Sequence, residues 1–312
     1  MLAFNLALQL ILLIILGIIV WRSGMVGEDF DKSLTSFIIN LALPCLIINS
    51  FNAPFSKDQL INCLILLALS LLILAVSFAV GQLCFKLCGG GYSGRILRFG
   101  AMFTNFSFVG IPVVEALYGQ LGVLYFVVFL VPIRMVYYSG AKPLLSPHGM
   151  NREKKTLLQT LAGWFSPPVI AVFIGLFLYV TGLRFPSFID NAIETVGSIS
   201  SPLGMIVCGI SLGKNNMRSL LKLKYLRMPI LRNLIMPALT VGILYFLPLD
   251  PLVAKVVVMF SALPVAALLS AFTIQYDPRP EAQLESSGSV MLSVLASAAT
   301  IPLWSAVAER LF

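Results

Sequence analysis

The sequence predicts an all-α membrane protein of ten transmembrane helices. Of its 312 residues, 59% are hydrophobic and only 11% are charged, whereas soluble domains carry about a quarter charged residues. The chain also divides into apolar stretches of about 20 residues, the length that crosses the hydrocarbon core of a bilayer. The ten predicted spans cover residues 4–22, 34–51, 60–87, 95–119, 121–140, 157–182, 191–213, 229–247, 252–276 and 287–310.

A correspondence between the two halves of the chain arranges these spans as two repeats. The polar loop at 141–156 separates a first five-helix unit, residues 1–140, from a second, residues 157–312. Because five is odd, the second unit enters the membrane upside down, as in the inverted repeats of many secondary transporters. Prolines occur in matching spans of the two units: Pro44 and Pro202, Pro112 and Pro264, Pro132 and Pro302. Prolines are common in membrane helices, so a chance agreement is the alternative.

The basic residues fall mainly on one side of the predicted spans. When successive loops are assigned to alternate sides, sixteen of the 21 Lys and Arg residues share one side, Arg232 among them, and four lie on the other. Because cytoplasmic loops are enriched in Lys and Arg, we expect a multi-pass protein of the cell membrane with both termini outside and residues 141–156 in the cytoplasm. This bias also accounts for the net charge of +8 without a nucleic-acid partner.

Residue types that serve catalysis or metal binding are scarce in the spans. The five cysteines lie within or at the ends of apolar stretches and form no CxxC pair, which favours small apolar residues over disulfides or metal ligands. The single histidine, His148, falls in the polar loop. The GxSxG match at 209–213 closes a membrane helix instead of joining a strand to a helix. We therefore expect neither an enzyme nor a bound metal or cofactor.

The strongest candidate site is the segment 103–112 in the fourth span. Pro112 lacks a backbone N–H and its ring clashes with the preceding turn, and Gly110 lets the chain open, so the helix is expected to break or kink there. Pro264 does the same in the ninth span. Two such breaks bring the positive ends of two half-helices together, which favours an anion, and the Asn105 amide offers a hydrogen bond to its oxygen. The alternative is two proline kinks and an amide that joins neighbouring helices.

Two ionisable residues lie further inside the spans. Arg134, the only basic residue placed well within a span, could neutralise an anionic substrate or extend its long side chain to the cytoplasmic headgroups. Glu115, one turn past Pro112, could carry a coupling proton or pair with Lys255, although extension of both side chains toward the outer surface explains them nearly as well.

The residues resemble the auxin efflux carrier family, which includes bacterial malate and malonate permeases. The likeness is clearest at Asn105, at Gly-Ile-Pro (110–112) with Ala-Leu-Tyr-Gly (116–119), and at 262–264 with Tyr276; 43–46, 202–209 and 300–302 add to it. The resemblance implies inverted repeats whose broken helices four and nine cross at Pro112 and Pro264, as in bile acid symporters and Na⁺/H⁺ antiporters. It also implies an elevator that moves against a scaffold of helices one, two, six and seven, and a role for Asn105 in substrate recognition.

We therefore expect a secondary transporter that moves a small mono- or dicarboxylate, such as malate, malonate or lactate, by alternating access. The short loop at 141–156 differs from the long cytoplasmic loop of many plant members and favours a prokaryotic carrier over an auxin exporter. An anion channel and a non-transporting receptor are the alternatives. The identity of the anion, the direction, the coupling ion and the choice between monomer and homodimer stay open. The candidate substrate-binding residues are Asn105, Gly110, Pro112, Pro264 and Arg134, with Glu115 as the candidate coupling residue.

Overall fold

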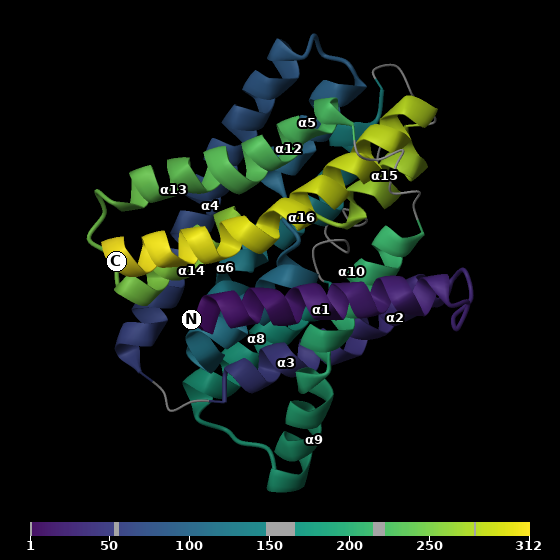
Figure 1. The fold of residues 1–312 in the computed structure, drawn as a ribbon. Helices are drawn as coiled ribbons and strands as arrows, with labels where there is room; N and C mark the ends of the chain where they lie inside the picture. Colours follow the sequence, from purple (N-terminus) through teal and green to yellow (C-terminus); the bar gives the residue numbers. More distant parts are fainter. Residues whose placement is uncertain (1, 53–55, 148–165, 215–221, 278) are drawn as a thin grey trace.

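The computed structural model describes residues 2–52, 56–147, 166–214, 222–277 and 279–312. Within these ranges the chain is helical and forms no strand, apart from one isolated antiparallel bridge between Thr104 and Val265. The start of α1 and the end of α16, near the two termini, lie on the same side of the view in Figure 1. The prediction of an all-helical protein is confirmed.

The N-terminal half consists of long helices followed by one interrupted helix. Its elements are α1 (Leu2–Arg22), then α2 (Phe30–Phe37), η1 (Ile38–Ala42) and α3 (Leu43–Ser50) in one continuous segment, α4 (Lys57–Leu87), α5 (Tyr92–Met102), η2 (Phe106–Gly110) and α6 (Ile111–Leu145). Both η1 and η2 are π-helical turns. Gly119 interrupts α6 with a φ of 64°, a conformation that glycine adopts without steric cost. This interruption lies where the fourth and fifth predicted spans meet.

The C-terminal half contains a second interrupted helix. Its elements are α8 (Pro167–Thr181), α9 (Ser187–Ser198), α10 (Ser200–Gly213), the 3₁₀ turn η3 (Leu223–Leu226), α12 (Arg227–Pro229), the π-helical turn η4 (Ile230–Ile235), α13 (Met236–Leu244), α14 (Pro251–Ala262), α15 (Leu268–Tyr276) and α16 (Pro280–Leu311). Asp250 begins α14 by accepting hydrogen bonds from the backbone N–H groups of Leu252 and Val253 at 2.9 and 3.2 Å. Gly182 ends α8 in the left-handed conformation, as glycine commonly does after a helix.

Several helices are long and apolar enough to cross a membrane. Among the described residues six segments meet both criteria, and three apolar helices are shorter. Large apolar side chains such as Leu64 on α4 and Phe177 on α8 are exposed, as expected where lipid replaces water. The chain is thus a multi-pass helical membrane protein; its division into ten spans and two repeats remains a prediction.

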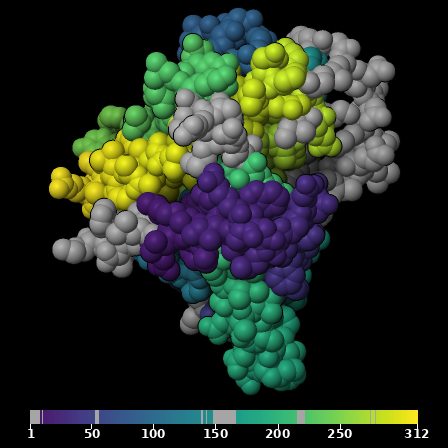
Figure 2. Space-filling view, turned by 45° about the vertical axis from the view of Figure 1, so that its right-hand side comes forward, coloured from purple at the N-terminus to yellow at the C-terminus, as the bar shows by residue number. Residues whose placement is uncertain are grey.

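Glycines allow the N-terminal helices to pack closely on the segment 166–214. A Cβ added at Gly17 of α1 would lie 2.2 Å from the carbonyl oxygen of Ile206, and one at Gly209 of α10 would lie 2.1 Å from that of Ile14. Small residues of this kind bring membrane helices into backbone contact. The GxSxG match at 209–213 is therefore a helix-packing feature. In Figure 2 the N-terminal helices cover much of one face, and α9, at the bottom of Figure 1, projects below them.

Candidate functional site

The two interrupted helices cross at their breaks. The stretch between α5 and η2 meets the stretch between α14 and α15, and the two exchange backbone hydrogen bonds. The N–H of Asn105 donates to the carbonyl of Pro264 at 2.8 Å, and the N–H of Ala266 donates to the carbonyl of Phe103 at 3.2 Å. This short antiparallel pairing satisfies backbone groups that a break would otherwise leave unpaired in an apolar interior. We call this region, residues 103–105 and 263–267, the crossing.

The break in the first interrupted helix lies earlier than predicted. The chain leaves α5 after Met102, and the extended residue is Phe103, whereas the sequence placed the break near Gly110 and Pro112. Pro112 follows the π-helical turn η2 directly as the second residue of α6, and the backbone stays helical there. In the second helix Pro264 lies within the break, as predicted, and its carbonyl takes part in the crossing.

Asn105 is the residue from which the second half-helix begins. Its backbone carbonyl accepts from the N–H groups of Val109 and Gly110, and its side-chain Oδ1 accepts from the N–H of Phe108 at 3.3 Å. The amide nitrogen Nδ2 faces Cys208 Sγ of α10 at 3.9 Å, and a sulfur atom is a weak acceptor. Asn105 is 4% exposed. The amide therefore uses its oxygen for capping and presents its nitrogen as a donor toward α10.

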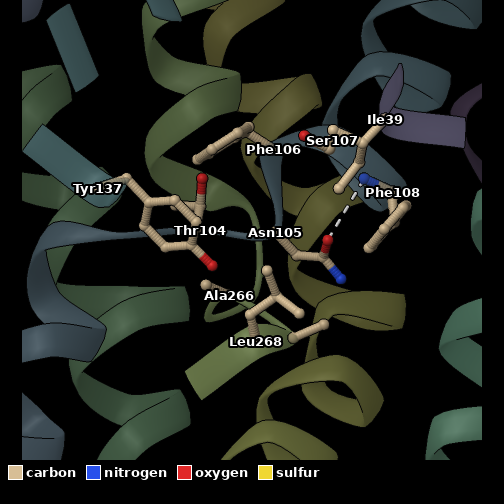
Figure 3. A pocket seen from close by; sticks show the side chains of 10 residues that line it. Ile39, Thr104, Asn105, Phe106, Ser107, Phe108, Tyr137, Ala266 and Leu268 are labelled. Atoms are coloured by element: carbon tan, nitrogen blue, oxygen red, sulfur yellow. Dashed lines mark hydrogen bonds between the residues drawn. The ribbon is translucent and has the colours of Figure 1, made fainter. Parts of the chain in front are cut away.

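A small cavity lies beside Asn105 at the crossing. Figure 3 shows the Asn105 amide, the Thr104 hydroxyl and the Tyr137 ring around it, with Ala266 and Leu268 on the neighbouring side. Its volume is about 20 Å³, room for little more than one water molecule. The first turns of the half-helices η2 and α15 both contribute to its wall. The lining residues are Ile39, Thr104, Asn105, Phe106, Ser107, Phe108, Tyr137, Ala266, Ala267 and Leu268.

Thr104 supplies a polar group that sequence reasoning did not single out. Its Oγ1 is buried and has no hydrogen-bond partner among the described residues, although it lies in the wall of the cavity. An unsatisfied buried hydroxyl costs about 1–3 kcal/mol. Its place next to Asn105 in the segment 103–112 was the available sequence signal. A ligand oxygen in the cavity would satisfy it.

The predicted site residues are only partly brought together. Asn105 lines the cavity, whereas Gly110, Pro112, Pro264 and Arg134 do not. A Cβ on Gly110 would lie 2.5 Å from a side-chain carbon of Leu263, so this glycine lets η2 pack on the second break. The roles assigned to these residues in substrate binding stay predictions.

Arg134 lies behind the cavity wall and away from the molecular surface. It is 2% exposed, and its guanidinium carbon lies 5.0 Å from the centre of the Phe106 ring, a distance typical of a cation–π contact. Phe106 is a wall residue of the cavity. The alternative in which Arg134 extends to the headgroups is thus wrong for this conformation.

Glu115 has a different partner from the one considered. Its carboxylate accepts a hydrogen bond from Ser201 Oγ of α10 at 2.9 Å. Lys255 instead pairs with Glu309 at 2.7 Å, because α14 packs directly on α16. The pairing of Glu115 with Lys255 is therefore wrong, and a coupling role for Glu115 stays a prediction.

Arg232 corrects the assignment of the basic residues. The sequence placed it on the cytoplasmic side and named Arg134 as the only basic residue well inside a span. In the structure Arg232 is 0% exposed and donates to carbonyl groups at the crossing and next to it. The helical segment that carries it runs from Leu223 to Leu244, so it begins six residues earlier than predicted, and Arg232 lies well within it.

An ion-pair cluster built on the buried residues Arg95, Asp277 and Glu285 joins α5, α15 and α16 away from the crossing. Asp277 accepts from Arg95 at 3.0 Å and from Arg279 at 2.5 Å, while Glu285 pairs with Lys224 at 3.4 Å. Burial raises the pKa of Asp277, but the hydrogen bonds from Arg279 and Arg95 outweigh it and hold that pKa below its usual value. Asp277 therefore stays ionised at neutral pH, and the cluster holds the three helices together.

Clustered metal ligands are not found in the described residues: no three His, Cys, Asp or Glu side chains lie close enough to hold an ion. The side chains in the wall of the cavity carry hydroxyl, amide, aromatic and aliphatic groups. Such a wall can bind a solute by hydrogen bonds and helix dipoles. Interrupted helices that cross within an apolar helical bundle are typical of membrane transport proteins.

The comparisons with known proteins agree with this class. The chain belongs to the auxin efflux carrier-type family described as membrane transport protein, which matches residues 2–305. It is 28% identical over 306 residues to a protein of Methanothermobacter thermautotrophicus described as an uncharacterized transporter, and the match covers 96% of each chain. The family expected from the residues around Asn105 is confirmed, and both findings point to a transporter and away from an enzyme.

Proposed function

We propose that this protein is a secondary transporter of a small organic anion, a mono- or dicarboxylate, that works by an elevator type of alternating access in the cell membrane. The observation that carries the proposal is the cavity at the crossing. The first turns of two half-helices line it, and the N-terminal end of a helix carries partial positive charge and N–H groups that favour an anion.

The polar groups at the cavity suit a carboxylate. Asn105 Nδ2 has a weak sulfur acceptor, and Thr104 Oγ1 is buried without a partner among the described residues. Both are donors, and a carboxylate oxygen is an acceptor. The buried guanidinium of Arg134 adds positive potential behind Phe106, and a charge is felt more strongly in a region of low dielectric constant.

The boundary between two groups of helices supports the elevator. In one group, α1, α2, α3, α8, α9 and α10, glycines allow close packing; Gly175 meets Phe51, and Gly197 meets the backbone of Leu46. The other group comprises α4 to α6 and α12 to α16. The cavity lies between the groups, since Ile39 comes from the first and Asn105 from the second. We propose that the first group is the scaffold and that the second moves.

The cavity at the crossing is too small for a dicarboxylate in this conformation. A second cavity, of about 300 Å³, lies between the same two groups. Its wall is largely polar and comprises Asn49, Ser50, Asn52, Gln59, Gln120, Leu121, Leu124 and Glu194. With both termini outside, this cavity opens at the outer surface, and we propose it as the outer entrance that joins the crossing when the moving group shifts. The inverted repeat, with residues 1–140 and 157–312 as its units, is part of the same proposal.

Counterflow in proteoliposomes tests the proposal. Vesicles are loaded with one unlabelled carboxylate, the labelled form is added outside, and the native protein is compared with Asn105→Ala. The matched control is Asn40→Ala, because Asn40 is an exposed amide on η1. We expect saturable accumulation with the native protein and the control, and a loss in Asn105→Ala.

The outcomes separate the alternatives. A channel would give flux without saturation or counterflow, and a receptor would give no flux with any solute. If no carboxylate accumulates above empty vesicles while the protein remains folded, the anion-carrier proposal fails. An inside-negative potential favours export of an anion by about 2.3 kcal/mol per charge per 100 mV, so export needs no coupling ion.

A further inference from the structure

The crossing also brings together the negative ends of two helices. The half-helix α5 ends at Met102 and α14 ends at Ala262, both at the crossing. The last carbonyl groups of a helix have no intrahelical donor, and they carry the negative end of the helix dipole. Two such helix ends side by side in an apolar interior require a positively charged hydrogen-bond donor.

Arg232 is that donor. Its Nη1 donates to the carbonyl of Ala101 at 2.9 Å, its Nη2 to that of Phe260 at 3.0 Å, and its Nε to that of Leu263 at 3.3 Å. Ala101 belongs to the last turn of α5, and Phe260 and Leu263 belong to the end of α14. One guanidinium thus bridges the C-terminal ends of both half-helices.

Asn233, the residue after Arg232, supports a backbone N–H group at the break. Asn233 Oδ1 accepts from Ser293 Oγ at 2.7 Å, and this hydroxyl in turn accepts from the N–H of Val265 at 3.0 Å. Consecutive residues of the π-helical turn η4 therefore satisfy the carbonyl groups and an N–H group of the crossing. π-helical turns of this kind are frequent at functional sites.

No carboxylate neutralises Arg232 within the described part of the chain. The ion pairs formed there join other residues, and all three hydrogen bonds of Arg232 go to carbonyl oxygens. A buried charge without a partner is costly. The negative ends of the two helix dipoles stabilise the charge of Arg232. In other transporters, carbonyl groups of unwound segments and of half-helix C-terminal ends coordinate Na⁺ in the same way.

We propose that Arg232 is a built-in cation that takes the place a bound Na⁺ would occupy between the two half-helices. The crossing then forms without a soluble cation. Removal of the guanidinium exposes three carbonyl oxygens from two helix ends, a set of ligands suited to a monovalent cation. A consequence, which rests on the proposed function, is that transport does not use a Na⁺ gradient.

Thermal unfolding of the purified full-length protein tests this without any substrate. The midpoint is measured in NaCl and in choline chloride of equal concentration for the native protein, for Arg232→Ala, and for Arg98→Ala. Arg98 is the matched control, because it is a buried arginine whose guanidinium reaches the carbonyl of a single helix end, Leu144. Ethylguanidinium at low millimolar concentration serves as a second probe.

We expect the native midpoint to be the same in both salts and both alanine variants to unfold at lower temperature. Na⁺ and ethylguanidinium should raise the midpoint of Arg232→Ala by several degrees in a saturable manner, because a ligand stabilises the state that binds it. Na⁺ should not raise that of Arg98→Ala, because removal of this guanidinium exposes the carbonyl of only one helix end. A native midpoint that rises saturably with Na⁺, or a folded Arg232→Ala that responds to neither probe, overturns the proposal.

Arg232→Lys keeps the test decisive if the alanine variant does not fold. Lysine retains the charge but not the three-donor fork, so we expect a folded protein with a lowered midpoint that is indifferent to Na⁺. A saturable response of this variant or of the native protein to Na⁺ contradicts the built-in cation. If the protein transports no carboxylate, the proposed function fails, but the unfolding midpoints expected here stay the same because they are measured without substrate.

Discussion

Thr104 shows how a single atom can connect structure to function. A hydroxyl that is buried without a partner among the described residues destabilises the protein, unless a water molecule or a ligand in the cavity bonds to it. In the proposed function the ligand is the carboxylate, because Thr104 and Asn105 are adjacent in the wall of the cavity. Stability and transport are thus expected to respond to Thr104 in opposite directions.

Replacement of Thr104 by valine separates these two effects. The isosteric change removes the unsatisfied hydroxyl, so the unfolding midpoint should stay the same or rise, whereas counterflow should fall about tenfold through loss of one hydrogen bond to the anion. Thr181→Val is the control, since Thr181 is exposed and bonds within its own helix. Unchanged counterflow in Thr104→Val would show that the Thr104 hydroxyl does not bind the substrate.

Local sequence patterns identify Asn105 but not Arg232. Asn105 stands out because an amide next to Gly110 and Pro112 is a polar group at a predicted helix break. Arg232 is not apparent in the same way, because the prediction began its span at residue 229 and left it near the polar end. Its partners are backbone carbonyl groups of α5 and α14, which carry no sequence signal. Only the folded crossing brings them to one guanidinium.

At the scale of helices, glycine determines how closely α1 approaches α10. Gly17 and Gly209 face each other, and a Cβ on either would overlap a backbone carbonyl of the other helix. A backbone atom cannot move aside as a side chain can. The expected cost of the overlap is about 1–3 kcal/mol for a single added methyl group.

Gly209→Ala should therefore lower the unfolding midpoint by several degrees. The control is Gly242→Ala in α13, because nothing lies within 4 Å of a Cβ at that position and alanine favours a helix. This control should keep or raise the midpoint. Equal midpoints for the two variants would mean that the close approach of α1 to α10 does not hold the protein together.

The positions of the helices were more predictable than their interruptions. Hydropathy marks long apolar segments, and the helices follow them, as α4 (Lys57–Leu87) follows the predicted span 60–87. The break after Met102 was predicted about two turns too late, because the helix continues through Gly110 and Pro112 by way of the π-helical turn η2. The extended chain at Phe103 depends on hydrogen bonds with residues 264–266, which are remote in sequence.

For the whole molecule, the boundary between the proposed scaffold and the proposed moving group is the feature on which the proposed elevator depends. Phe108 contacts Gly204 across it, and Ser201 donates to Glu115. A contact of one ring on a glycine and a single hydrogen bond can be exchanged at lower cost than the packing of α1 on α10, where backbone atoms touch. The boundary is therefore where the molecule is expected to slide.

A covalent bridge across this boundary tests the elevator. The accessible native cysteines are first replaced, and Glu115→Cys on α6 is combined with Ser201→Cys on α10. A short bifunctional thiol reagent then links the two introduced cysteines through a bond that reduction can cleave. We expect this bridge to stop counterflow. Lys255→Cys with Glu309→Cys is the control, since that pair lies at a similar contact distance but within the proposed moving group. Its bridge should leave counterflow intact. If the bridged Glu115 and Ser201 pair transports as fast as its reduced form, the two groups do not move past each other, and the anion must reach the crossing by local opening of the cavity instead.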